Sequence, residues 1–254
     1  YGSFALDDGN YTLNQQTYEQ ILASSPTISP LLRPFIGGRE LLHSEKRWCV
    51  WLKDATPSQI RQSPELMARL DRVRSWRSSS NRETTRKLAA TPGLFAEIRQ
   101  PASDYVAMPT VSSERRNYIP LGFLPADVIA SNQIYIMPNA SAFHFGVLHS
   151  TMHMAWVRAV CGRLESRYRY SAGIVYNNFP WPKPSASNAV EAAARDVLDA
   201  RAQFPAATLA DLYDPLTMPP ALVKAHQRLD KAVDDAYIAE EKVAGRKTPK
   251  LRII

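Results

Sequence analysis

The sequence has little of what marks a secreted or a membrane protein. Only two of its 254 residues are cysteine, Cys49 and Cys161, too few for the disulfide framework of a small secreted domain. They lack metal-ligand spacing and lie in apolar windows, so we expect two buried free thiols. No run approaches the roughly 20 apolar residues of a membrane-spanning helix, and Tyr1–Phe4 does not resemble a signal peptide. We therefore expect a cytoplasmic protein without a membrane partner.

Signatures of catalysis are missing as well. Gly37-Gly38 is the only glycine pair, and it lacks the strand and helix context of a phosphate-binding loop. Of His144, His149 and His153, only the last two share a helix face, and no glutamate accompanies them as in a zinc hydrolase. We therefore predict no catalytic residue, no metal and no cofactor in this chain. A carboxylate pair assembled by the fold is the enzymatic alternative that the sequence leaves open.

The sequence does have an excess of positive charge. Lysine and arginine number 31 against 24 aspartate and glutamate, which gives a net charge of +7 and favours a polyanionic partner. The excess is concentrated in Leu66–Ala90, where seven basic residues stand against two acidic ones. A solvated helix face is the alternative explanation for this window. The residues of the window that we predict to contact DNA are Arg72, Arg74, Arg77 and Arg82.

Short apolar runs separated by prolines predict strands with irregular connections. These runs are Leu94–Ile98, Tyr105–Met108, Tyr118–Phe123 and Gln133–Met137. Two further runs, Glu40–His43 and Arg47–Leu52, flank a polar tripeptide and predict a β-hairpin. Together these segments indicate a mixed sheet.

Helical patterns fill much of the remaining sequence. Ser63 is a good N-cap and Pro64 suits a first helical position, so a helix should follow them. Ser141–Val160 is predicted as one core helix, because apolar residues recur on one stripe, namely Phe145, Leu148, Met152, Ala155 and Ala159. The other predicted helices are Thr17–Ala23, Asn188–Ala202 and a long one from Pro219 to about Glu241.

These elements predict an α+β fold in which packed helices accompany the mixed sheet. We divide the chain into a lead-in over residues 1–35, an α/β part over 36–182 and a helical C-terminal segment over 183–254. The last boundary lies in the proline-rich stretch Trp181–Ser185, after which the composition becomes helical. Just before it, Phe179 and Trp181 stand in a proline-flanked turn that is interpreted as an anchor for the helical segment.

Residues 162–171 alternate arginine with tyrosine. In one extended segment, Arg163, Arg167 and Arg169 would point to one face, and Tyr168 and Tyr170 to the other. Guanidinium groups can bind phosphates or the edges of guanines, so we predict that these three arginines contact DNA. An exposed edge strand with solvated arginines is the alternative.

Two loops combine hydroxyl, amide and guanidinium groups between predicted strands. Thr110–Tyr118 suits contacts with phosphate oxygens or base edges, and Ser131–Gln133 carries amides that can pair with adenine. Solvated loops are the alternative for both. The residues of these loops that we predict to contact DNA are Ser112, Ser113, Arg115, Arg116, Asn132 and Gln133.

Several longer motifs stand in an order that resembles a known family. They are Tyr1–Ser3, Asp7–Asn10, Arg33–Glu40, Arg47–Leu52, Ser113–Pro120, Phe145–His153, Cys161–Ser171 and Asn178–Pro182. The chain resembles, over nearly its whole length, the C-terminal part of the MmeI-like restriction-modification enzymes and of related adenine-specific DNA methyltransferases.

The resemblance implies a target recognition domain, followed by a helical C-terminal segment, that binds double-stranded DNA. It places the N6-adenine methyltransferase domain, with its S-adenosylmethionine site, upstream of Tyr1 in the same polypeptide. The missing initiating methionine leads us to expect a piece of such a longer protein. This chain alone would then catalyse nothing, and would present a chosen adenine to the upstream domain after base flipping. A protein-interaction or scaffolding segment without DNA specificity is the alternative.

Overall fold

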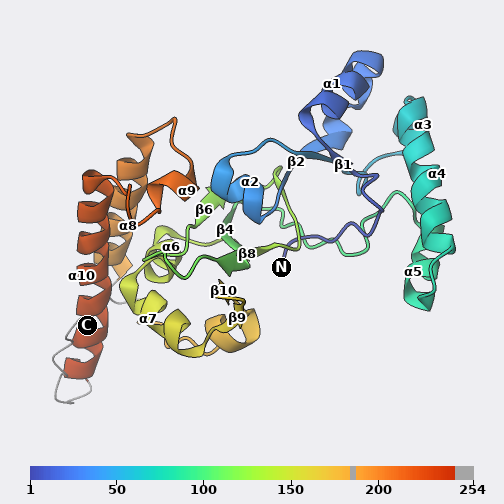
Figure 1. The fold of residues 1–254 in the computed structure, drawn as a ribbon. Coiled ribbons are helices and arrows are strands. Elements are labelled where there is room, and N and C mark those ends of the chain that lie inside the picture. Colours follow the sequence, from blue (N-terminus) through green and yellow to red (C-terminus); the bar gives the residue numbers. More distant parts are fainter. Residues whose placement is uncertain (184–186, 244–254) are drawn as a thin grey trace. The chain divides into compact units, whose positions relative to one another are not determined.

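The computed structural model describes residues 1–183 and 187–243 (Figure 1). Residues 184–186 and 244–254, which belong to the predicted C-terminal segment and its boundary, lie outside the described residues. The chain forms two compact units. The first unit comprises residues 1–107 and 123–138, and the second comprises 108–122 and the chain from 139 onward.

A four-stranded sheet lies in the first unit, with the strand order β1-β3-β2-β7. β3 pairs antiparallel with both of its neighbours, whereas β2 and β7 run parallel. These strands are β1 (Thr12–Leu13), β2 (Leu32–Ile36), β3 (Trp48–Val50) and β7 (Ile129–Ala130). The core against this sheet includes Leu13, Phe35, Val50, Leu66, Val73 and Phe95.

Five α-helices and two short 3-10 helices, Pro26–Leu31 and Leu88–Ala90, accompany this sheet in the described part of the first unit. The α-helices are α1 (Gln15–Ser24), α2 (Gly38–His43), α3 (Pro57–Arg61), α4 (Pro64–Ser78) and α5 (Glu83–Lys87). α4 begins as predicted, because the Ser63 side chain accepts a hydrogen bond from the amide of Leu66 and Pro64 occupies the first turn. Leu66, Leu70 and Val73 then bury one face of the helix.

A second sheet has the strand order β6-β4-β8. Its strands are β4 (Tyr105–Pro109), β6 (Gly122–Leu124) and β8 (Ile134–Pro138). They lie within or beside three of the predicted apolar runs. The fourth run, Leu94–Ile98, forms only an isolated bridge between Glu97 and Phe4, so the prediction of a strand there is wrong.

The second unit holds a small antiparallel sheet and five α-helices among its described residues. The sheet has the order β5-β10-β9, formed by β5 (Val111–Ser112), β9 (Gly162–Leu164) and β10 (Arg167–Arg169). The helices are α6 (Ala142–Leu148), α7 (Thr151–Val160), α8 (Ser187–Ala202), α9 (Leu209–Leu212) and α10 (Pro220–Val243). α8 lies against both α6 and α10 (Figure 1). The α+β class and the two long C-terminal helices are thus confirmed.

Two local predictions are wrong. Glu40–His43 is part of α2 rather than a hairpin strand, because the Glu40 carboxylate accepts a hydrogen bond of 2.7 Å from the amide of Gly37 and caps the helix. Residues 141–160 form two helices rather than one. Ser150 interrupts them: its hydroxyl donates to the carbonyl of Val147 and accepts from the amide of His153, which starts α7.

The break also changes which side chains α7 buries. Ala155 and Ala159, placed on the apolar stripe by sequence, are exposed, and His153, Met154 and Val157 are buried instead. Cys49 is a buried free thiol as predicted, whereas Cys161 is only half-buried. Over the described residues, none of the helices combines the length and apolar character needed to cross a membrane.

Candidate nucleic-acid interface

The sheet of the second unit brings two predicted DNA-contacting segments together. In its register, Tyr168 of β10 lies opposite Ser112 of β5, and Arg169 lies opposite Val111. On the other side of β10, Arg167 pairs with Leu164 and Tyr168 pairs with Arg163. We call β5, β9 and β10 the arginine sheet. It places residues 162–170 directly beside the start of loop 113–117.

In β5 and β10 the arginine sheet has one buried face and one more exposed face, whereas all three residues of β9 are exposed. Residues opposite each other in an antiparallel pair share a face, so Arg163 lies with Tyr168, where its guanidinium sits 4.0 Å from the ring centroid. Arg167 and Arg169 point to the exposed face. The prediction that all three arginines share one face is therefore wrong. The chain reverses at Glu165, which has a φ of 57°, rather than continuing as one strand.

The buried face of the sheet is held by a histidine. Tyr170 is buried, and its hydroxyl lies 3.0 Å from Nε2 of His153. Nδ1 of the same ring lies 2.9 Å from the carbonyl of Leu148, which can only accept, so Nδ1 carries the proton and Nε2 accepts from Tyr170. Burial lowers the pKa of His153 to about 4, which keeps the ring neutral at pH 7. The tyrosines thus fix the sheet and leave the arginines at the surface.

The exposed arginines differ in their partners. Arg167 forms an ion pair of 2.6 Å with Glu165, and Arg163 donates to the carbonyl of Ser166. Arg169 is exposed, and within residues 1–183 and 187–243 its guanidinium has neither an ion pair nor a hydrogen bond. It is the arginine of this sheet that is available to an anion without first losing another contact.

Loop 113–117 continues directly from β5. It is a turn, since the amide of Arg116 donates to the carbonyl of Ser113 and the amide of Arg115 donates to the hydroxyl of Ser113. Arg115 is exposed. Arg116 is half-buried, and this burial lowers its pKa, against the opposing effect of the Asp214 carboxylate. The side chain of Ser112, in β5 itself, lies on the buried face of the sheet, so Ser112 is not among the proposed contacts.

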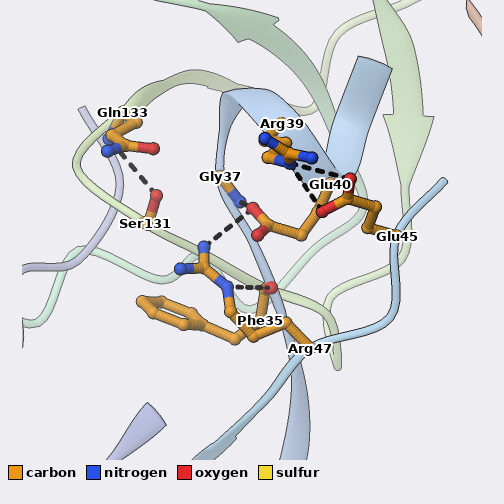
Figure 2. A network of polar contacts seen from close by, with 8 residues as sticks. All are labelled: Phe35, Gly37, Arg39, Glu40, Glu45, Arg47, Ser131 and Gln133. Carbon is orange, nitrogen blue, oxygen red and sulfur yellow. Dashed lines mark hydrogen bonds and ion pairs between the residues drawn. The ribbon is translucent and has the colours of Figure 1, made fainter. Parts of the chain in front are cut away.

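In the first unit, the predicted residues Asn132 and Gln133 are exposed at the rim of a pocket of about 280 Å³. Its wall includes Phe35, Arg47 and Trp76. Figure 2 shows Arg47 reaching over the Phe35 ring toward Glu40, with a guanidinium-to-ring distance of 4.7 Å and an ion pair of 2.8 Å. The pocket therefore combines aromatic surface with amide and guanidinium groups.

Gly37 makes this arrangement possible. A Cβ at this position would lie within 2.8 Å of atoms from Glu40, Arg47 and Gln133, all of which surround it in Figure 2. In the sequence analysis the glycine pair was considered as a phosphate loop and as part of a family motif, and Arg47 was placed in a predicted strand and a family motif without being named as a site residue. No local signal marks Arg47, because its partners Phe35 and Glu40 lie 12 and 7 residues away.

The basic residues of and after α4 fall into two groups. Arg72, Arg74 and Arg82 form the first group and are exposed. Arg72 contacts Asn10 and Glu65, and Arg74 contacts Asp71. Arg82 stands at the start of α5. Arg77 is fully buried. Its guanidinium donates to the carbonyls of Ala5, Leu6, Leu88, Thr91 and Leu94. It is a structural residue in the core, and we remove it from the predicted contacts.

Comparison with known proteins gives the family. The family model described as "MmeI, target recognition domain" matches residues 1–183 of the chain. The model described as "MmeI, C-terminal domain" matches residues 182–254. The chain belongs to the MmeI family. This confirms the resemblance inferred from the motifs, and it places both the arginine sheet and the Arg47 pocket within the target recognition domain of the family.

Two relatives extend the MmeI assignment. DNA methyltransferase A of Bacillus subtilis (strain 168) is 39% identical over 239 residues, which cover 93% of this chain and 27% of that protein. The solved structure of the Type IIL restriction-modification enzyme MmeI in complex with DNA is 46% identical, with a TM-score of 0.91. That match covers 98% of this chain and 33% of the MmeI chain. The chain thus spans between a quarter and a third of the length of these relatives.

Proposed function

We propose that this chain recognises a specific sequence in double-stranded DNA on behalf of a methyltransferase domain in the same polypeptide. The observation that carries the proposal is the register of the arginine sheet, which gathers Arg167, Arg169 and loop 113–117 on one surface. Guanidinium groups in this arrangement suit phosphates and guanine edges. The MmeI structure bound to DNA supports the same role.

The chemistry of the side chains distinguishes contacts with phosphates from contacts with base edges. Arg169 is exposed and without a partner among the described residues, which leaves its guanidinium free for a phosphate, whereas the amides of Asn132 and Gln133 can pair with adenine. Both groups of contacts are needed, since phosphates fix the register and base edges specify the sequence. The proposed contacts are Arg72, Arg74, Arg82, Ser113, Arg115, Arg116, Asn132, Gln133, Arg163, Arg167 and Arg169.

In the intact protein, an N6-adenine methyltransferase domain N-terminal to this chain would bind S-adenosylmethionine and receive the flipped adenine. The chain alone would not catalyse methylation, and the intact enzyme would act in the cytoplasm. Within the chain, we propose a lead-in over residues 1–35, a recognition domain over 36–182 and a helical C-terminal segment over 183–254. The two family matches, which meet at residues 182–183, support the second boundary.

The test is selection of duplexes from a random pool by this chain at two salt concentrations, followed by sequencing of the retained DNA. We expect a shared short motif that persists at the higher salt concentration. Salt-sensitive retention without a motif would contradict sequence recognition by the chain itself. The absence of any binding would favour a protein-interaction segment.

Replacement of Arg169 by alanine should weaken binding to all duplexes by a similar factor. The logarithm of the binding constant falls linearly with the logarithm of the salt concentration, and the loss of one phosphate contact makes this slope shallower by about 0.9. Arg195→Ala is the matched control, because Arg195 is an exposed arginine of α8 with an ion pair of 3.4 Å to Glu191. The measurement is a salt titration by fluorescence anisotropy. An unchanged slope with altered base preference would mean that Arg169 reads a base instead.

A further inference from the structure

We infer that the C-terminal helices hold loop 113–117 in its DNA-contacting conformation, with Asp230 and Arg201 as positioning residues. The inference rests on the proposed function, because it assigns those helices a part in the same recognition step. All the contacts that support it lie within the second unit. They join the segment that follows the loop, residues 118–121, to α8 and α10.

The first connection is made by Tyr118, the residue directly after the loop. Its ring is buried, and its hydroxyl donates to Oδ2 of Asp230 at 2.8 Å. The ring also stacks on His226, with 3.9 Å between centroids and 26° between planes. Both partners belong to α10. The end of the loop is thus fixed to one helix by a hydrogen bond and by a stacking contact.

Asp230 is itself fixed in place. Its other oxygen, Oδ1, accepts a hydrogen bond of 2.8 Å from the amide of Thr151, in the first turn of α7. A carboxylate is favoured there because the amides at a helix start carry partial positive charge. Asp230 therefore joins three elements, which are α10, α7 and the segment after the loop. A side chain held at both oxygens can hold Tyr118 in a single position.

The second connection is made by Arg201 of α8, which donates from Nη1 to the carbonyl of Leu121 at 2.7 Å. Its Nε donates to the hydroxyl of Tyr213 at 2.7 Å, and its Nη2 lies 3.0 Å from Nδ1 of His149. Since the Tyr213 hydroxyl accepts from Arg201, it donates its own proton to Nε2 of His226, 2.9 Å away. All three nitrogens of the Arg201 guanidinium therefore make hydrogen bonds, which hold the group in one position.

The other end of the loop is fixed by the arginine sheet. The amide of Tyr170 donates to the carbonyl of Thr110 at 2.9 Å, and β5 pairs with β10 over the next two residues. The five residues between Ser112 and Tyr118 are therefore held at both ends before any DNA arrives. A loop that is ordered in advance loses less conformational entropy on binding, which favours tight and discriminating contacts.

The experiment compares the wild-type chain with Tyr118→Phe and Asp230→Asn. Tyr118→Phe keeps the ring and its stacking contact but removes the hydrogen bond to Asp230. We expect the amides of residues 113–117 to exchange hydrogen faster, and the affinity for the selected duplex to fall about 3- to 10-fold, the effect of one lost hydrogen bond. Affinity for a scrambled duplex should change little, so the ratio of the two affinities falls.

Tyr105→Phe is the matched control. Tyr105 is also a buried phenol that donates to a single acceptor, the carbonyl of Val128 at 2.6 Å, but it belongs to the first unit. We expect it to leave loop exchange and the affinity ratio unchanged. This control separates the removal of a buried hydroxyl in general from the release of this loop.

The two proposals fail in different ways. A wild-type chain without sequence preference overturns the proposed function, and the exchange rates of residues 113–117 still show whether Tyr118 and Asp230 hold the loop. A wild-type chain with preference, together with variants that match it in exchange and in affinity ratio, overturns the positioning role. If Asp230→Asn fails to fold, Tyr118→Phe decides alone, because it leaves the contact between Asp230 and Thr151 in place.

Discussion

Replacing Arg77 by methionine should destabilise the first unit by about 3–5 kcal/mol, a large part of the roughly 5–15 kcal/mol that stabilises a typical domain. Methionine keeps most of the buried volume, but it cannot donate to the five carbonyls that Arg77 reaches. Those carbonyls come from two segments, residues 5–6 and 88–94, so the loss should loosen both from α4. Each buried carbonyl left without a partner adds its own desolvation cost.

Urea unfolding, followed by tryptophan fluorescence and by hydrogen exchange in α4, measures the effect. The control is Arg74→Met, one turn earlier on the same helix, where the arginine is 56% exposed and forms an ion pair with Asp71. We expect a change below about 1 kcal/mol for the control, as for other exposed ion pairs. If the Arg77→Met chain kept its stability but bound DNA poorly, Arg77 would be a DNA contact rather than a structural residue.

Arg77 also shows what charge counting in a sequence can and cannot reveal. Arg74 and Arg77 lie three residues apart in one basic window, yet one is in solvent and the other is in the core. The partners of Arg77 lie 11 to 72 residues away, so no local pattern distinguishes it. The excess of arginine indicated an anionic partner, but it could not say which arginines serve the fold.

The elements predicted correctly are those specified by local chemistry. α4 follows from Ser63 and Pro64, and the two long C-terminal helices follow from their composition and spacing. Two errors arise where a local capping contact was overlooked: the Glu40 carboxylate on the amide of Gly37, and the Ser150 hydroxyl between Val147 and His153. Residues 141–160 break at Ser150, and α7 then begins beside the carboxylate of Asp230, 79 residues from Thr151. The contact with Asp230 has no signal in the local sequence.

The candidate site follows the same division. The motif around residues 162–171 drew attention to the right segment, but the hairpin at Glu165 moved Arg163 to the other face. The pairing of β10 with β5, which joins this segment to loop 113–117, spans more than fifty residues and was not predicted. The resemblance supplied the family, whereas the structure supplies which side chains share a surface.

Acidification from pH 7 to pH 5 should destabilise the second unit by about 4–6 kcal/mol, through three buried histidines. His149, His153 and His226 are all fully buried. Burial, which comes first among the causes for each, lowers the pKa of His153 to about 4, that of His226 to about 3, and that of His149 well below its usual range. Arg201 adds to the effect for His149 and His226 through charge repulsion.

The direction follows from where the protons bind. In the unfolded chain each histidine binds a proton near pH 6.5, whereas in the folded chain these three stay neutral to a lower pH. The stabilisation is therefore complete above about pH 6.5 and is lost as pH falls toward the folded values, by up to about 1.4 kcal/mol per pH unit for each histidine. Asp230 opposes part of this loss, since burial raises its pKa and the folded state takes up that proton more readily.

The free energy of unfolding, measured in urea at half-unit steps from pH 7.5 to pH 5, gives the number of protons involved. We expect a slope that approaches three protons below pH 6, reduced by the carboxylate. His153→Gln should reduce the slope by nearly one proton, because glutamine can still donate to Leu148 and accept from Tyr170 but does not titrate. His43→Gln, at an exposed position, is the control for the substitution of a histidine by glutamine. A profile that is flat over this range would mean that the histidines are protonated in the folded chain, and that the network around Arg201 is arranged differently from the one described.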